Sequence, residues 1–253
     1  MSSTTARRGV FTALPSYVAA VAELPVSAEL TDAIRGAVVV MPGSRNWWQG
    51  LLEAREAGAA AVVVADPDVL PREVLGSGEW PGGIPVIIER PRLRPDVVAD
   101  AVRARNGSPA AVVTVECTAA PSGLGAVVCD GLGWARSLSP GPLTLRAGSA
   151  VGRARMVLLD APAPGGALPV SLLATESGLH PGGLLQLLAL GEVRSEVTVD
   201  QAALLTRVET SRADGTLRAP ARYESSARLA CGAHSRRARP ANRSRTWMAC
   251  SET

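Results

Sequence analysis

Three short segments of the sequence could place polar groups at one edge of a sheet. Each segment directly follows a short apolar run and contains charged residues, and the three are "MPGSR" (41–45), "ADPD" (65–68) and "ERPR" (89–92). In α/β proteins ligands bind outside the carboxyl ends of the parallel strands. These three strand ends are therefore the first candidates for a binding site.

The first segment has the chemistry of an anion site. Gly43 allows a tight turn, the amides around Ser44 and Arg45 open a predicted helix, and Arg45 adds a positive charge. Such an arrangement can hold a phosphate or a carboxylate. The alternative is a helix capped by Ser44 that needs no ligand, and we favour it.

Two acids, Asp66 and Glu89, stand at the ends of the second and third apolar runs. A carboxylate at such a place can accept a hydrogen bond from a ribose hydroxyl. The alternative is a solvated strand end, which is the commoner case for an acidic residue.

Several familiar motifs do not occur. No G-x-G-x-x-G follows a strand and no G-x-x-x-x-G-K-[ST] is present, so a dinucleotide pyrophosphate lacks its usual glycine turn. His180 in "HPGG" is interpreted as a turn residue rather than a catalytic base.

The four cysteines show no C-x-x-C spacing. Their spacing predicts reduced thiols in a cytoplasmic protein, without a metal site or disulfide.

The elements that position these segments alternate between strands and helices. Helices are predicted over 44–58, ending at Gly58, and over 95–107, with one helical turn near 70–75. Buried strands are predicted over 36–41, 59–67, 84–89 and 110–117. Alternation of this kind predicts a Rossmann-like parallel sheet with helices on its faces.

The pattern changes near residue 118. After a helical stretch over 126–140, six strand-like runs follow, separated by turns such as "APGG", "HPGG" and "ADGT". We therefore predict an α/β domain over 1–118 and an α+β domain with a large, mostly antiparallel sheet over 119–230.

The last segment, 231–253, differs in composition and is predicted to be an irregular basic tail, with five Arg and one Glu. It is interpreted either as an out-of-frame ending or as a disordered basic extension.

The other residues are nearly neutral, which argues against a nucleic-acid partner. No run of 18 apolar residues occurs, so no membrane span is expected. The N-terminus is interpreted as an ordinary segment rather than a signal peptide.

The order of "AAVVVADPDVLP", "IPVIIERPRLRPDVVADAV" and "AAVVTVEC" resembles the nucleotide-binding domain of the glucose-fructose oxidoreductase/inositol dehydrogenase family. Members of that family show "D-x-V-x-x-A-T-P" and "E-K-P" at the corresponding strand ends. Asp66 and Pro67 match the first motif loosely. Glu89 and Arg90 match the second, with Arg in place of Lys.

The second half resembles the substrate domain of the same family, and the likeness covers about residues 59–230. Its opening helix reads like "G-G-G-x-L-x-D-x-G-x-H" in the family. Asp130 or Cys129 stands at the acidic position, and the histidine position falls on Gly133 or Trp134. The resemblance implies NAD(P) as the cofactor if there is one, bound near Gly43, Ser44, Arg45, Asp66, Pro67 and Glu89.

The departures from the family decide the predicted function. The chain contains no lysine, and Arg90 stays protonated, so it binds anions but does not readily shuttle a proton. We predict a degenerate member that binds a small molecule or a partner subunit without hydride transfer. One alternative is an active NAD(P)-dependent oxidoreductase on a sugar or polyol, with Asp130 and Arg90 as catalytic residues. The other is an assembly protein that forms a homo-oligomer through the C-terminal sheet.

Overall fold

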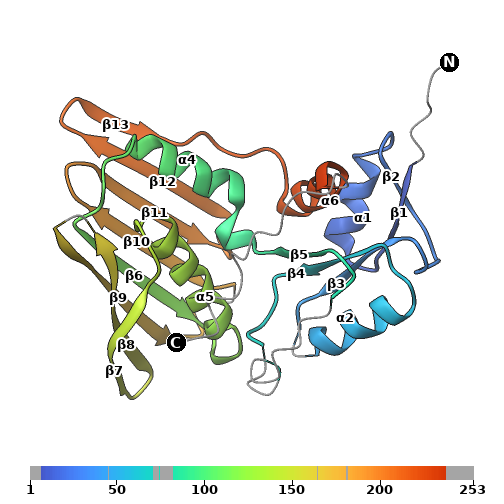
Figure 1. Ribbon diagram of the computed structural model, residues 1–253, viewed down its shortest axis with the longest axis horizontal. Coiled ribbons are helices and arrows are strands. Elements are labelled where there is room, and N and C mark those ends of the chain that lie inside the picture. Colours follow the sequence, from blue (N-terminus) through green and yellow to red (C-terminus); the bar gives the residue numbers. More distant parts are fainter. Residues whose placement is uncertain are drawn as a thin grey trace. The chain divides into compact units, whose positions relative to one another are not determined.

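The computed structural model describes residues 7–44, 46–70, 74, 82–163, 165–180 and 182–237, with side chains as far as 232. These residues form two compact units (Figure 1). The first contains the chain up to Pro91 and the segment that begins at Arg222, and the second runs from Arg92 to Ala221. The units thus separate at residue 91 and again at 221, whereas the change in sequence pattern suggested 118 and 230.

The first unit is built on a parallel five-stranded sheet in the order β2-β1-β3-β4-β5. Its strands are β1 (Arg8–Phe11), β2 (Ala28–Leu30), β3 (Val38–Pro42), β4 (Ala61–Ala65) and β5 (Val86–Glu89). The last three confirm the predicted parallel strands. β1, the helix α1 (Pro15–Ala22) and β2 were not predicted, because the two strands are only four and three residues long and carry charged residues.

Helices cover both faces of this sheet, so its central strands are apolar throughout. Val38 and Val40 pack with α1 and α6 (Ser226–Arg237), while Val39 packs with α2 (Trp47–Glu56). Gly58, with a φ of +80°, follows the end of α2 as predicted. The helical turn predicted near 70–75 lies almost entirely outside the described residues.

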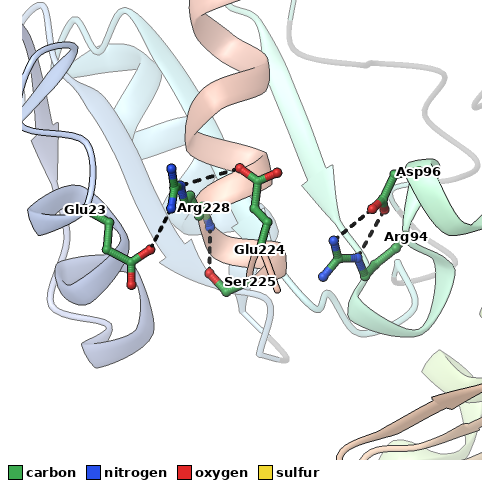
Figure 2. A network of polar contacts seen from close by, with 6 residues as sticks. All are labelled: Glu23, Arg94, Asp96, Glu224, Ser225 and Arg228. Atoms are coloured by element: carbon green, nitrogen blue, oxygen red, sulfur yellow. Dashed lines mark hydrogen bonds and ion pairs between the residues drawn. The ribbon is translucent and has the colours of Figure 1, made fainter. Parts of the chain in front are cut away.

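An ion pair fastens α6 to α1 in the first unit (Figure 2). Arg228 Nη1 lies 3.3 Å from Glu23 Oε2, and its Nε lies 3.6 Å from Glu224 Oε1. The hydroxyl of Ser225 accepts a hydrogen bond from the Arg228 amide at 3.2 Å. The helix continues to Arg237, so residues 231–237 are helical and not irregular as predicted.

The helix continues past 230 because its inner face finds a core. Ala227 and Ala230 are buried against the parallel sheet, and Cys231 packs beside them. Residues 238–253 lie outside the described part of the chain. The out-of-frame hypothesis for the tail therefore remains a prediction.

The second unit is built on an eight-stranded sheet in the order β13-β12-β11-β10-β6-β9-β8-β7. All neighbours are antiparallel except β6 and β9. The strands are β6 (Val112–Ala119), β7 (Thr144–Val151), β8 (Ala154–Ala163), β9 (Gly166–Glu176), β10 (Leu184–Leu190), β11 (Arg194–Asp200), β12 (Leu205–Arg212) and β13 (Gly215–Arg218). This confirms the predicted large, mostly antiparallel sheet.

The strand β6 corrects one prediction. It was expected in the parallel sheet but pairs with β9 and β10 in the larger one. Val113, Val115 and Cys117 are buried, and the residues between them are not. Alternation with Thr114 and Glu116 is typical of a sheet covered on one face only, unlike the buried runs of β3 and β4.

Two helices, α4 (Pro95–Arg105) and α5 (Pro121–Ser137), pack on this sheet and share its core. Trp134 from α5 and Leu172 and Leu185 from the strands are among its most deeply buried side chains. Figure 1 shows both helices against the sheet. Within the described residues, no helix has the length and apolar content needed to cross a membrane.

Candidate functional site

The three predicted strand ends lie at one edge of the parallel sheet. Pro42, Ala65 and Glu89 form a row of neighbours across β3, β4 and β5. The polar residues that follow these strands therefore emerge along the same edge. Arg45, one of the predicted anion-binding residues, lies outside the described part of the chain.

Gly43 holds two loops of this edge together. Its amide donates to Ala65 O at 2.7 Å, and its carbonyl accepts from the Asp68 amide at 2.6 Å. A Cβ at this position would lie 2.1 Å from Pro67 Cα. The glycine is thus required by the close approach of the two backbones, and its amide is committed to a backbone acceptor.

Ser44 does not cap α2 as predicted. The N-cap residue is Asn46, and its side chain makes no capping hydrogen bond. The Ser44 carbonyl instead accepts from the Trp47 amide at 2.8 Å. The indole Nε1 of Trp47 donates to Asp68 O at 3.1 Å and ties the helix to the neighbouring loop.

The acids of this edge remain partly accessible. Asp66 has a φ of 48°, and its amide donates to Glu89 O at 2.8 Å, which extends the strand pairing by one residue. Asp66, Glu89 and Arg90 are all intermediate in exposure. The pKa of the Tyr17 phenol is raised, first by burial and second by the negative charge of Glu89.

The strand order places the topological switch point between β1 and β3, where ligands of such sheets bind. The turn from β1 to α1 contains no glycine, and Pro15 has no amide hydrogen. The amides of Tyr17 and Val18 both donate to Leu14 O at 3.0 Å. The Leu14 amide donates to Thr12 Oγ1 at 3.2 Å. This turn does not fit a dinucleotide pyrophosphate in the usual way.

Asp130, the predicted catalytic acid, lies inside the second unit on α5. Its side chain is 0% exposed, and Arg92 Nε donates to Asp130 Oδ2 at 2.7 Å. Arg92 is itself only 4% exposed, and its Nη1 donates to Gly182 O at 3.2 Å. Arg92 lies within the predicted segment 89–92, but no sequence pattern connects it with a helix 38 residues away.

The two positions expected for a histidine on α5 are also packed. Trp134 is 0% exposed, and its Nε1 donates to Arg92 O at 2.8 Å. A Cβ at Gly133 would lie 2.4 Å from Leu93 Cδ2. The α5 positions that resemble the family's acid and histidine therefore form a buried structural contact with residues 92 and 93.

Cys117 on β6 lies beside this buried pair. Its thiol contacts Val127 O at 3.6 Å, and a Cβ at Gly131 would lie 2.9 Å from its Sγ. Burial, and then the nearby Asp130 carboxylate, raise the pKa of Cys117 to about 12. Cys129, the other residue considered for the acidic position, is partly buried and is not in a disulfide.

His180 lies in the turn between β9 and β10, as predicted. Its carbonyl accepts from the Gly183 amide at 2.9 Å, and its Nδ1 lies 3.7 Å from Asp200 Oδ2. Among the described residues, no three His, Cys, Asp or Glu side chains group as metal ligands. Cys117, Cys129 and Cys231, the cysteines within the described residues, are not in disulfides.

Comparison with known proteins finds similarity at the level of the fold. No family model and no curated protein matches the sequence. The 3-ketoreductase KijD10 from Actinomadura kijaniata, in complex with TDP-benzene and NADP, has a TM-score of 0.64 at 12% identity. The alignment with KijD10 covers 97% of this chain and 93% of that one.

Two further solved structures agree. An oxidoreductase from Sinorhizobium meliloti has a TM-score of 0.61 at 13% identity, over 91% of this chain and 89% of that one. The UDP-N-acetylglucosamine 3-dehydrogenase GnnA from Acidithiobacillus ferrooxidans has a TM-score of 0.56 at 13% identity, over 90% and 89% of the two chains. The chain therefore has the two-domain fold of these oxidoreductases, as the resemblance to the glucose-fructose oxidoreductase/inositol dehydrogenase family implied.

Proposed function

We propose that this chain is a degenerate member of that oxidoreductase family, which binds a small molecule or a partner subunit without hydride transfer. The observation that carries the proposal is the complete burial of Asp130 in an ion pair with Arg92. A general acid or base must come within hydrogen-bond reach of the proton that it transfers. A carboxylate that is 0% exposed and bonded to a guanidinium does not meet that requirement.

The neighbouring residues offer no replacement. The Trp134 indole is a donor with no titratable proton near neutral pH, and Gly133 has no side chain. Arg90, at the end of β5, carries a guanidinium, which donates hydrogen bonds and has no acceptor site. Together these residues leave Arg90 and the α5 positions that resemble the family's acid and histidine without an accessible group that accepts a proton from a substrate alcohol.

A ligand would be held at the carboxyl edge of the parallel sheet. We assign an anionic group to the loop after β3 and hydroxyl groups to the acids after β4 and β5. The proposed binding residues are Gly43, Ser44, Arg45, Asp66, Pro67 and Glu89. Because the Gly43 amide is already bonded to Ala65 O, Gly43 would contribute the shape of the loop rather than a donor.

The alternative is an active NAD(P)-dependent oxidoreductase on a sugar or polyol, with Asp130 and Arg90 as catalytic residues. The solved neighbours favour it, since KijD10 is described in complex with TDP-benzene and NADP, and GnnA as a dehydrogenase of UDP-N-acetylglucosamine. The β1–α1 turn argues against it, because it contains no glycine and Pro15, in the first turn of the helix, has no amide hydrogen to donate to a pyrophosphate.

A titration with NADH and NADPH separates the two functions. Energy transfer from the tryptophans to the reduced nicotinamide reports binding, and we expect no saturation up to millimolar cofactor. Saturable binding together with turnover that Asp130→Asn abolishes would overturn the proposal. A gain in thermal stability from a metabolite in the absence of nicotinamide would identify the ligand, since binding stabilises by RT ln(1 + [L]/Kd).

An assembly role is favoured by a separate observation on the larger sheet. A shallow, mostly apolar pocket lies over β8 and β9, with Leu158, Leu159, Pro169 and Val170 in its lining. On the same face of β8, Met156 and Leu158 are 49% and 45% exposed. Light scattering of the purified chain tests this role, and the substitution Leu158→Arg is expected to dissociate a homo-oligomer formed through this face.

The absence of a disulfide at Cys117, Cys129 and Cys231 fits a reducing, cytoplasmic compartment.

A further inference from the structure

The tight turn directly after α4 contains Asn106 and Gly107, the only Asn-Gly pair of the sequence. Asn106 has a φ of 51° and a ψ of 44°, and Gly107 has a φ of 79°. The Ser108 amide donates to Arg105 O at 3.0 Å and closes the turn. Positive φ at both central residues is typical of a type I′ turn, for which Asn-Gly is a preferred pair. The backbone of the turn therefore accounts for the presence of these two residues.

Both residues of the pair are open to solvent. A Cβ built on Gly107 meets no atom within 4 Å. Among the described residues, neither the Asn106 carboxamide nor the Gly107 amide has a hydrogen-bond partner. Water therefore reaches the carboxamide, and no acceptor holds the neighbouring amide nitrogen.

We propose that Asn106 is a site of spontaneous deamidation, at which the carboxamide becomes a carboxylate. The Gly107 nitrogen, after losing its proton to hydroxide, attacks Asn106 Cγ. The new N–Cγ bond closes a succinimide ring, the Cγ–Nδ2 bond breaks, and ammonia leaves with a proton taken from water. Water then opens the ring at one of its two carbonyls. Opening at Cγ gives aspartate, and opening at the main-chain carbonyl gives isoaspartate, in which the chain runs through Cγ.

The residue after each asparagine decides whether this reaction is open to it. Ring closure needs rotation about ψ of the asparagine and approach of the next nitrogen, and Gly107 has no side chain to hinder either. Asn46 is also exposed, but it is followed by Trp47, which is only 5% exposed. The Trp47 amide donates to Ser44 O at 2.8 Å. The two exposed asparagines thus differ in the availability of the attacking nitrogen.

Isoaspartate would lengthen the main chain inside the turn by one carbon, or about 1.5 Å. The turn is held on both sides by Arg105, whose carbonyl accepts from the Ser108 amide and whose Nε donates to Ser108 O at 3.1 Å. Arg105 is 4% exposed, and its Nη1 donates to Ser195 Oγ on β11 at 3.0 Å. The longer turn would draw Ser108 away from this buried guanidinium, and a buried donor without its acceptor is costly. Deamidation would therefore weaken the attachment of α4 to the larger sheet, independently of any ligand at the parallel sheet.

Ageing of the full chain at mildly alkaline pH tests the proposal. Digestion with pepsin at acidic pH stops the reaction, and electron-transfer fragmentation distinguishes aspartate from isoaspartate. We expect both products at position 106 while Asn46 stays intact. The rate should be within about tenfold of that in the urea-unfolded chain, because exposed turns open at little cost in free energy. It should also rise with pH, since the attacking nitrogen must lose its proton.

The substitution Asn106→Gly is the matched control, because glycine keeps the positive φ and removes the carboxamide. We expect the Tm of the parent chain to fall on ageing and the Tm of the variant to stay unchanged. The isoaspartate form, separated by ion exchange through its additional negative charge, should have a lower Tm than the fresh chain.

Two results would overturn the proposal. If Asn106 stays intact in the folded chain while it converts in urea, the turn protects it and the site does not exist in the native protein. If the purified isoaspartate form has the Tm of the fresh chain, the longer turn leaves the bonds of Arg105 in place, and the structural consequence is wrong.

Discussion

The carboxyl edge of the parallel sheet and the α5 interior of the second unit differ in how water reaches their charges. Both contain residues that resemble motifs of an oxidoreductase family. At the edge, Asp66 and Glu89 keep part of their surface exposed, whereas Asp130 has none. The difference teaches that the order of motifs along a chain predicts the fold, and that packing decides which carboxylates can do chemistry.

The physical reason lies in the surroundings of each carboxylate. A buried charge is tolerated only with a partner and hydrogen bonds, and Asp130 has Arg92 Nε at 2.7 Å. Arg92 is in turn held by Gly182 O and supports the indole of Trp134. The edge acids follow strand ends and need no such enclosure, so they remain available to a ligand.

The strongest test of this contrast is the substitution Asp130→Ala. It leaves the Arg92 guanidinium buried without a carboxylate, and we expect a loss of about 3–5 kcal/mol in the free energy of unfolding. Urea denaturation followed by tryptophan fluorescence measures it. Asp100→Ala, which removes a carboxylate from an ion pair with the exposed Arg103, is the control and should cost about 0–1 kcal/mol.

Equal losses in the two variants would contradict the contrast. Asp130 would then be reached by water in solution, and a catalytic role for this carboxylate would have to be considered again.

The substitution Gly43→Ala tests the edge itself. The new Cβ would lie 2.1 Å from Pro67 Cα, so the loops after β3 and β4 must move apart. We expect a loss of about 1–3 kcal/mol, as for other overpacked sites. Gly123→Ala, on α5 with no atom within 4 Å of the new Cβ, should be neutral or stabilising. A Gly43 variant as stable as the parent would show that the two loops are not locked.

The smallest expected effect concerns reactivity rather than stability. The thiolate is the reactive form, and the pKa of Cys117 is raised from 9.0 to about 12. At pH 8 its thiolate fraction should therefore be roughly a thousandfold below that of an unshifted thiol. Its labelling should increase as the pH rises toward 12.

Alkylation of the native chain, read out by peptide mass spectrometry, measures this protection. At pH 8, Cys117 should react only after unfolding in urea, which provides the reference rate on the same residue. Fast labelling of native Cys117 at pH 8 would mean that the interior around Asp130 opens to solvent.

Much of the fold was predictable because its signals are local. The valine runs of β3 and β4, the glycine after α2 and the turns of the second half each depend on neighbours in sequence. The alternation in β6 was also present in the sequence, but it was interpreted as a buried run. The short strands β1 and β2 gave no such signal, since a strand of three or four residues has too few positions to show a period.

The sequence by itself thus determined the two kinds of sheet, most of the elements and the common edge of Asp66 and Glu89. Only the tertiary structure decided what each charge meets. Arg92 finds Asp130 across 38 residues, and Arg105 finds Ser195 across 90. Such partners are fixed by how a helix packs on a sheet, and no local pattern of residue types records that packing.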